Sequence, residues 1–336
     1  MAIHKQQNEF SGAAGEYPVD SLTVTVITDN YYDKLRPDQK IARRAKTAHG
    51  TSLHGEHGLS YHIEASASGG THAFMFDYGV EGEGIVKNMK LLEIDLGRLE
   101  AFALSHGHYD HWGSLTYLLK GQGARIKKGI PLYVGEETFA RRFAKPPAKA
   151  DQPREATQNA EDLGQLARDE IERLGIVKIV EITAPTEVVP GAFLTGNIER
   201  VTAYEKGFAR LLIERGNTLE PDSFQGEQAF VFNVKEKGLV VVSSCAHAGI
   251  INTIRHAQKI TGVEHVHAVL GGFHLTGAEP ALIEQTVADM KRIHPDYIAP
   301  MHCTGFEAIT AFARAMPEEF ILNTAGTRYD FDSGEA

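Results

Sequence analysis

A short segment crowded with metal-binding side chains constrains this chain more than any other feature. Residues 106–111 read His-Gly-His-Tyr-Asp-His, so three imidazoles and one carboxylate fall within six residues. These are the groups that zinc and similar divalent cations prefer, and four of them cannot share one buried turn without a cation. The apolar run at 99–105 predicts a buried strand, and the run at 112–119 predicts a helix. The segment therefore predicts a metal site on a strand-to-helix loop.

Further blocks follow this motif, and together they resemble the metallo-β-lactamase superfamily. The blocks are EHGLS at 56–60, TGNI at 195–198, SCAHAGI at 244–250, GGFHL at 271–275 and HCTG at 302–305. In this order they are similar to the dihydropterin-methyl-ribofuranosylaminobenzene-phosphate synthase-like branch. The resemblance implies an α/β fold of the αββα-sandwich type, with two sheets face to face and helices on both outer surfaces.

The hydrophobic pattern agrees with such a sandwich. Apolar runs predict strands at 22–28, 59–64, 73–78, 101–105, 177–182, 192–198, 229–234, 239–243, 267–270 and 297–300. Three- and four-residue spacing predicts helices over 84–92, 160–174, 249–261, 279–293 and 306–315. We interpret residues 1–336 as a single domain with two irregular segments. The polar, proline-bearing stretch 145–159 predicts a surface insertion, and 218–227 is a candidate lid over the site.

Composition narrows the class of partner. The chain has 336 residues, 42% of them hydrophobic, which suffices for a large core. A net charge of −10, without a block of basic residues, excludes nucleic acid as the main partner and favours a small-molecule substrate. No run approaches the roughly eighteen apolar residues of a membrane helix, and the N-terminus lacks the apolar core of a signal peptide. We therefore expect a cytoplasmic protein without a membrane partner, as a monomer or a homo-oligomer.

The resemblance also implies a ligand set for two divalent cations, which we expect to be zinc, with manganese or iron as alternatives. It assigns one metal to His106, His108 and His247, and the other to Asp110, His111 and His302. It further implies a Gly-Asp pair, with a bridging aspartate, where this chain has Ser244-Cys245. Cys245 then either binds the second metal as a thiolate or lies just outside the ligand set. A sulfur ligand suits zinc better than manganese.

Roles for the remaining polar groups follow from metal-assisted attack by water. Asp110 would orient the water and accept its proton. His274 would donate to an anionic substrate or leaving group, or else replace His247 as a ligand. Glu56 is the candidate acceptor for the second ring nitrogen of a ligand histidine, and His57 is a further donor. Di-iron oxidoreductases of this superfamily generally carry a glutamate where His108 stands, so His108 favours hydrolysis over redox chemistry.

These features favour a metal-dependent hydrolase acting on a small phosphoryl, ester, lactone or amide compound. One alternative is a methanopterin-type synthase that displaces phosphate. That reaction needs a phosphorylated substrate, and the sequence shows no glycine-rich phosphate loop or basic cluster beside the motifs. The other alternative is a regulatory ligand-binding protein on the same scaffold, because a fold does not decide a function.

Overall fold

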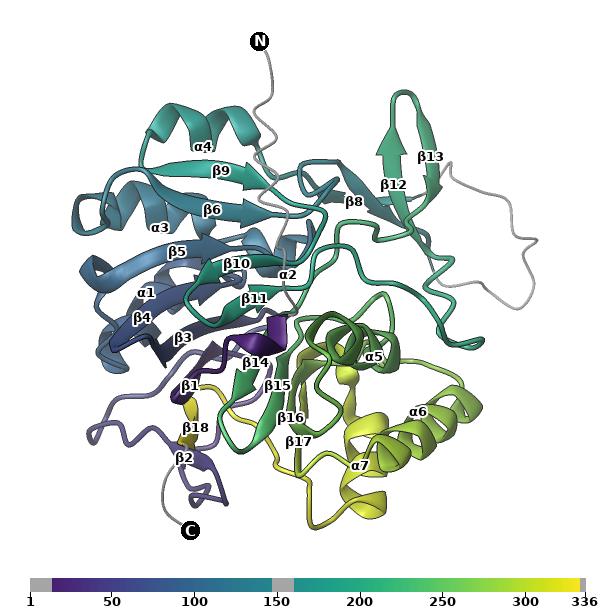
Figure 1. The fold of residues 1–336 in the computed structure, drawn as a ribbon. Coiled ribbons are helices and arrows are strands. Elements are labelled where there is room, and N and C mark those ends of the chain that lie inside the picture. The colour runs from purple at the N-terminus through teal and green to yellow at the C-terminus, as the bar shows by residue number, and fades with distance from the viewer. Residues whose placement is uncertain (1–13, 147–159, 333–336) are drawn as a thin grey trace.

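The protein is described by a computed structural model over residues 14–146 and 160–332 (Figure 1). Its strands are β1 Ser21–Thr28, β2 Ala42–Arg44, β3 Ser60–Ala67, β4 Gly70–Phe76, β5 Leu99–Ala103, β6 Ile130–Val134, β7 Arg142–Ala144, β8 Glu161–Gly164, β9 Val177–Glu181, β10 Thr186–Val189, β11 Ala192–Leu194, β12 Leu211–Arg215, β13 Thr218–Pro221, β14 Phe230–Val234, β15 Gly238–Val242, β16 Val266–Gly272, β17 Tyr297–Met301 and β18 Thr327–Asp332. Its α-helices are α1 Gly82–Leu91, α2 Tyr109–Trp112, α3 Leu115–Gln122, α4 Arg168–Leu174, α5 Ile250–Thr261, α6 Pro280–Ile293 and α7 Phe306–Ala315.

Two large sheets form the centre of the molecule. The first has eight strands in the order β2-β18-β1-β3-β4-β5-β6-β9, and the second has six in the order β10-β11-β14-β15-β16-β17. Strands β4, β5, β6 and β9 of the first sheet run parallel to one another, as do β15, β16 and β17 of the second. Parallel strands end at a common edge, so the loops that follow them lie side by side.

The main core lies between these two sheets. Leu22, Val24 and Val26 alternate with threonines along β1, and this period of two directs the three apolar side chains into the core. Phe74 of β4 meets Phe230 of β14 with ring centroids 4.7 Å apart. Each fully buried phenylalanine contributes about 1.5–3 kcal/mol to folding. The core therefore fixes how the two sheets face each other.

Helices cover the outer face of each sheet, as Figure 1 shows. Apolar residues of α1, α3 and α4 pack on β4, β5 and β6 of the first sheet. Helices α5, α6 and α7 pack on β16 and β17 of the second. The predicted αββα sandwich is thus confirmed.

A third, four-stranded antiparallel sheet, β13-β12-β7-β8, lies beside the sandwich and corrects two expectations. The helix predicted over 160–174 is wrong in its first half, because Glu161–Gly164 pairs with β7 and Gly164 has a φ of +87° that ends the strand. Helix α4 begins only at Arg168. The segment 218–227 is not irregular throughout, because Thr218–Pro221 pairs with β12. Most of the predicted insertion, 147–159, lies outside the described residues.

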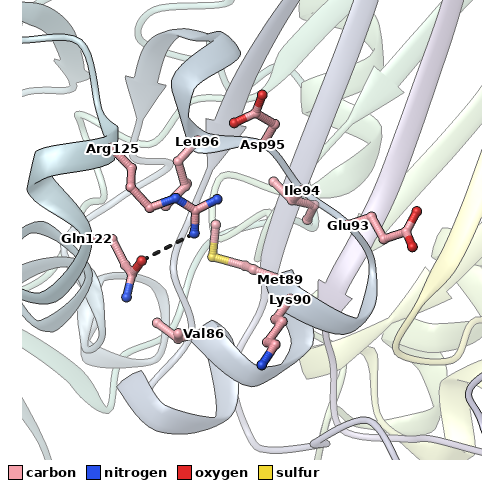
Figure 2. A pocket seen from close by; sticks show the side chains of 9 residues that line it. All are labelled: Val86, Met89, Lys90, Glu93, Ile94, Asp95, Leu96, Gln122 and Arg125. Carbon is pink, nitrogen blue, oxygen red and sulfur yellow. Dashed lines mark hydrogen bonds between the residues drawn. The ribbon is translucent and has the colours of Figure 1, made fainter.

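A pocket on the outer surface lies away from the strand ends that carry the histidine motif. Figure 2 shows it between the C-terminal part of α1 and the end of α3, with Met89, Leu96 and Arg125 among its lining residues. It lies near the start of β5, whereas the histidine motif follows the end of that strand. No helix within residues 14–146 and 160–332 has the length and apolar composition needed to span a bilayer.

Candidate metal centre

The histidine motif occupies the loop between β5 and α2, and a glycine shapes it. His108 is the N-cap of α2, so Asp110 and His111 project from the one-turn helix that starts at Tyr109. A Cβ atom on Gly107 would lie 2.1 Å from an Arg142 guanidinium nitrogen and 2.4 Å from the Thr138 carbonyl oxygen. Only glycine fits there, so the loop passes close to β7 and turns both flanking imidazoles inward.

The first group of candidate ligands consists of His106, His108 and His247. One nitrogen from each ring lies within 4.8 Å of the other two, and all three residues are buried. The Nε2 atoms of His106 and His247 are 3.2 Å apart. Two nitrogens bound to one tetrahedral zinc at about 2.0–2.1 Å would be separated by about 3.3 Å. Nε2 of His108 is buried without a hydrogen-bond partner among the described residues, as expected for a nitrogen whose partner is a metal ion.

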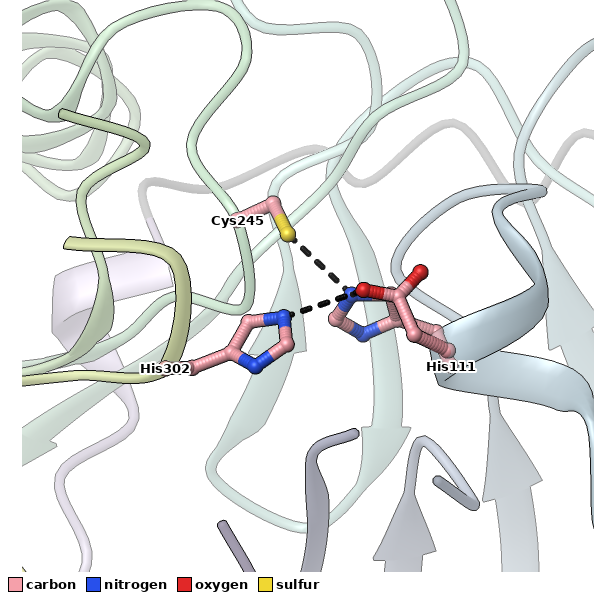
Figure 3. Close-up of side chains that lie close together, drawn as sticks. His111, Cys245 and His302 are labelled. Carbon is pink, nitrogen blue, oxygen red and sulfur yellow. Dashed lines mark hydrogen bonds and ion pairs between the residues drawn. The ribbon is translucent and has the colours of Figure 1, made fainter. Parts of the chain in front are cut away.

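The second group consists of Asp110, His111, Cys245 and His302, whose ligand atoms also lie within 4.8 Å of one another. Figure 3 shows Cys245 and His302 on separate loops, with Cys245 facing the His111 ring and His302 facing a carboxylate oxygen beside it. The Cys245 Sγ is 3.1 Å from Nε2 of His111, and an Asp110 carboxylate oxygen is 3.2 Å from Nε2 of His302. The donor set of two imidazoles, one carboxylate and one sulfur fits a borderline cation such as zinc.

Burial and mutual contact set the charge of these groups. Burial, reinforced by the neighbouring histidines, holds the pKa values of His106, His108 and His247 well below the usual range. These rings are therefore neutral at pH 7, the form that binds metal. Burial alone would raise the pKa of the Asp110 carboxyl, but His111 and His302 hold that pKa well below its usual range. Asp110 is consequently an anion at neutral pH.

Asp77, which the sequence analysis missed, orients the motif from the end of β4. Its Oδ2 accepts hydrogen bonds from Nδ1 of His111 at 2.8 Å and from Oγ of Ser105 at 2.7 Å, and also from Oγ of Ser244. Oγ of Ser105 is in turn 2.8 Å from Nδ1 of His106. With both Nδ1 atoms engaged, the Nε2 atoms of His106 and His111 point toward the other candidate ligands, where a cation would bind. An aspartate directly after a buried strand was the available signal.

Glu56 does not take the role expected for it. Its two carboxylate oxygens accept backbone N–H groups of Val80 and Glu81 at 2.8 Å, and one is 3.2 Å from Nε2 of His54. Glu56 therefore fixes the loop between β4 and α1 and contacts no ligand histidine. The expectation failed because the sequence did not show which histidine lies next to which carboxylate.

His247 and His274 occupy different positions in the structure. His247 belongs to the first ligand group, whereas His274 does not, although their ring centroids are 4.1 Å apart. The His274 ring lies 4.0 Å from that of Phe208. Burial, with the nearby His302, lowers the pKa of His274 to about 4, so this ring is neutral at pH 7. His247 therefore lies within the first group, and His274 lies beside it.

The segment 222–227, which is part of the candidate lid, packs against His247. The Phe224 ring stacks on the His247 ring at 3.8 Å and 7°. The Glu227 carboxylate accepts the backbone N–H groups of His247 at 2.7 Å and of Ala248 at 2.6 Å. These contacts hold a turn in which Ala246 has a φ of +57°, a conformation that costs of order 1–3 kcal/mol.

His302 is held in a comparable way, with a φ of +52°. Its backbone N–H donates to the Asp29 carboxylate at 3.0 Å, and its carbonyl oxygen accepts from the Asn30 side chain at 3.0 Å. His57 stacks on the His302 ring at 5.0 Å, and its Nε2 lies 3.5 Å from the Asp110 carboxylate. The residues that follow β1 thus hold the candidate ligand His302 in place. The half-exposed side chain of His57 covers the His302 ring.

Comparison with known proteins identifies relatives of this chain. The family model of the metallo-β-lactamase superfamily matches residues 53–191. The 7,8-dihydropterin-6-methyl-4-(β-D-ribofuranosyl)-aminobenzene-5'-phosphate synthase of Methanocaldococcus jannaschii is 33% identical over 81% of this chain and 88% of its own. An uncharacterized protein of the same organism is 24% identical over 77% and 88%.

Among solved structures, one described as a metal-dependent hydrolase of the β-lactamase superfamily has a TM-score of 0.69 and 24% identity, covering 93% of this chain and all of that one. This likeness supports the fold. Because the synthase relative passes 30% identity across most of both chains, this protein belongs to the metallo-β-lactamase superfamily, in the dihydropterin-methyl-ribofuranosylaminobenzene-phosphate synthase-like branch.

Proposed function

We propose that the protein is a metal-dependent enzyme with a two-cation centre, and that its reaction is hydrolysis of a small phosphoryl, ester, lactone or amide compound. The observation that carries this proposal is the pair of adjacent ligand groups, one of three residues and one of four, with every ligand atom of a group within 4.8 Å of the others. In this proposal His247 is the third ligand of the first group and Cys245 belongs to the second. Two bound cations would lower the pKa of water toward about 7 and polarise the oxygen under attack.

The residues of the chain have separate tasks in this proposal. Asp110 is buried and anionic at neutral pH, so its carboxylate accepts the proton of the attacking water. His274 is neutral, so it acts as a hydrogen-bond donor to the substrate without adding positive charge. Phe208 and Phe224, which contact His274 and His247, exclude solvent from that side of the centre.

A synthase reaction is the second candidate, favoured by the 33% identity to the named synthase over 88% of its length. In such a reaction the aminobenzene nitrogen would form a bond to the 6-methyl carbon of a dihydropterin, a phosphate leaving group would depart from that carbon, and the nitrogen would lose a proton. Arg142 lies beside the histidine motif but is already paired with Asp222 at 2.8 Å. A substrate phosphate would therefore be recognised by the cation site rather than by this arginine.

A turnover screen separates the two candidates. Zinc-loaded protein would be assayed with phosphodiester, lactone, thioester and β-lactam substrates, and in parallel for phosphate release from an activated dihydropterin in the presence of the ribofuranosylaminobenzene phosphate. Hydrolysis that disappears in Asp110→Asn supports the hydrolase. Phosphate release that depends on both synthase substrates supports the synthase. Inactivity of the metal-loaded protein in both assays would contradict the enzyme proposal and favour a ligand-binding role.

A further inference from the structure

A second cluster of metal-binding side chains lies at the opposite end of the strands that carry the candidate centre. It consists of His265, His267 and Asp296, with one ligand atom from each residue within 4.8 Å of the other two. His267 is near the start of β16, and Asp296 directly precedes β17. His302 directly follows β17, six residues further on, so at about 3.3 Å per residue the two clusters are roughly 20 Å apart. Neither shares a ligand with the other.

The three donor atoms lie near the spacing of a coordination site. One oxygen of Asp296, Oδ2, lies 3.0 Å from Nε2 of His265 and 2.6 Å from Nδ1 of His267. Ligand atoms around a tetrahedral zinc, with bonds of about 2.0–2.1 Å, are separated by about 3.3 Å. A small cation can therefore replace the shared hydrogen-bonding protons once the Asp296 oxygen moves away from the His267 ring.

The cluster is held in place by the surrounding fold. The His267 ring packs edge-on against Tyr297 and Phe331, with centroids 5.4 and 5.8 Å away. The backbone N–H of Asp296 donates to the Val266 carbonyl at 3.2 Å, which ties the starts of the two strands together. A Cβ on Gly238 would lie 2.7 Å from Cδ2 of His265, so the start of β15 packs directly on that ring. Preorganised ligands of this kind lower the cost of binding.

We propose that His265, His267 and Asp296 form a separate site for a divalent cation of the zinc class. Two imidazoles and one carboxylate supply three ligands, and the exposure of His265 and Asp296 leaves the remaining positions to water. The cation would tie the start of β16 to the start of β17. The site is independent of the proposed catalytic reaction.

Zinc stoichiometry of the full-length protein tests this site. Metal-free protein would be equilibrated with zinc chloride at micromolar concentration, and bound zinc measured by elemental analysis and calorimetry. The variants are His265→Ala and Asp296→Asn. The matched control is His72→Ala, because His72 also contacts a carboxylate, Glu100 at 3.1 Å, but belongs to no group of three ligands among the described residues. The side chain of His265 is 54% exposed, so its removal should leave the fold intact.

We expect each cluster variant to bind one zinc fewer than the wild type, and His72→Ala to match the wild type. His247→Ala should lose zinc at the candidate centre yet keep the equivalent that depends on His265. Zinc should also raise the melting temperature of His247→Ala more than that of the double variant His247→Ala/His265→Ala. Equal zinc content in wild type and both cluster variants would overturn the proposal. Binding only at millimolar zinc would also overturn it, since the three residues would then form an ordinary hydrogen-bonded cluster.

Discussion

The buried ion pair between Arg142 and Asp222 gives the sharpest test of how the third sheet supports the metal centre. Nε of Arg142 lies 2.8 Å from the Asp222 carboxylate, and the two side chains are 3% and 0% exposed. The other Asp222 oxygen accepts the backbone N–H of Phe224 at 2.7 Å. Phe224 stacks on His247, and Arg142 packs against Gly107, which lies between His106 and His108. The ion pair is therefore connected to all three residues of the first ligand group.

Asp222→Ala leaves the Arg142 guanidinium buried without its partner. Removing one member of a buried pair costs about 3–5 kcal/mol, a large part of the roughly 5–15 kcal/mol by which a domain is usually stable. Urea unfolding of the metal-free protein should therefore show a large fall in the free energy of unfolding, with an unchanged dependence on urea concentration. The control is Asp162→Ala, which breaks the exposed pair with the neighbouring Arg141 and should change stability little.

The double variant Arg142→Met/Asp222→Leu separates stability from positioning. Apolar side chains of similar volume commonly replace a buried ion pair without loss of stability, so this variant should recover most of the unfolding free energy. It should still bind zinc more weakly than the wild type, because the hydrogen bond to the Phe224 backbone is not restored. If Asp222→Ala is no less stable than Asp162→Ala, the reasoning is refuted.

Three further predictions concern the centre itself. Asp77→Ala should lower zinc affinity about 10- to 100-fold in a chelator competition, because His111 loses the acceptor at its Nδ1, and unchanged affinity would contradict that role. Asp110→Asn should keep the circular dichroism spectrum of the wild type and lower turnover about 10²- to 10⁴-fold, whereas wild-type turnover would show that another group takes the proton. Burial raises the pKa of Glu227 to about 7, although hydrogen bonds from the Ala248 and His247 backbone oppose the rise. The stability that protonated Glu227 gives to the metal-free protein is therefore full below the unfolded pKa of 4.5 and is lost as the pH rises through 7. The loss should total about 3 kcal/mol and be absent in Glu227→Gln, and parallel pH profiles for the two proteins would count against it.

Local chemistry made the sandwich and its metal motif readable in the sequence. The sequence of β1 alternates apolar residues with threonines, and that of β15 is a continuous apolar run, so each can be recognised as a strand without knowing which strand it pairs with. The alternation is informative because side-chain direction in a strand repeats every two residues. Imidazoles packed as densely as in 106–111 have few uses besides metal binding. The fold was therefore predictable to the level of its layers, and the first four candidate ligands could be identified by position.

Short strands could not be predicted in this way. Thr218–Pro221 is exposed and polar, and it is a strand only because β12 lies beside it. Glu161–Gly164 likewise depends on its pairing with β7, and local helical spacing was a misleading guide. In both cases a partner distant in the chain decides the conformation, and a single sequence does not show that partner.

Only the tertiary structure decided which carboxylate serves which imidazole. Asp77 and Glu56 are both acidic residues near motif blocks, yet Asp77 reaches His111 while Glu56 holds the backbone at Val80. The separation of His247 from His274 depends in the same way on the turn at Ala246, which Glu227 fixes from the loop before β14. The sequence by itself determined the kind of chemistry, because ligand types are a property of side chains. The tertiary structure decided the roles, because distance and burial are properties of the folded chain.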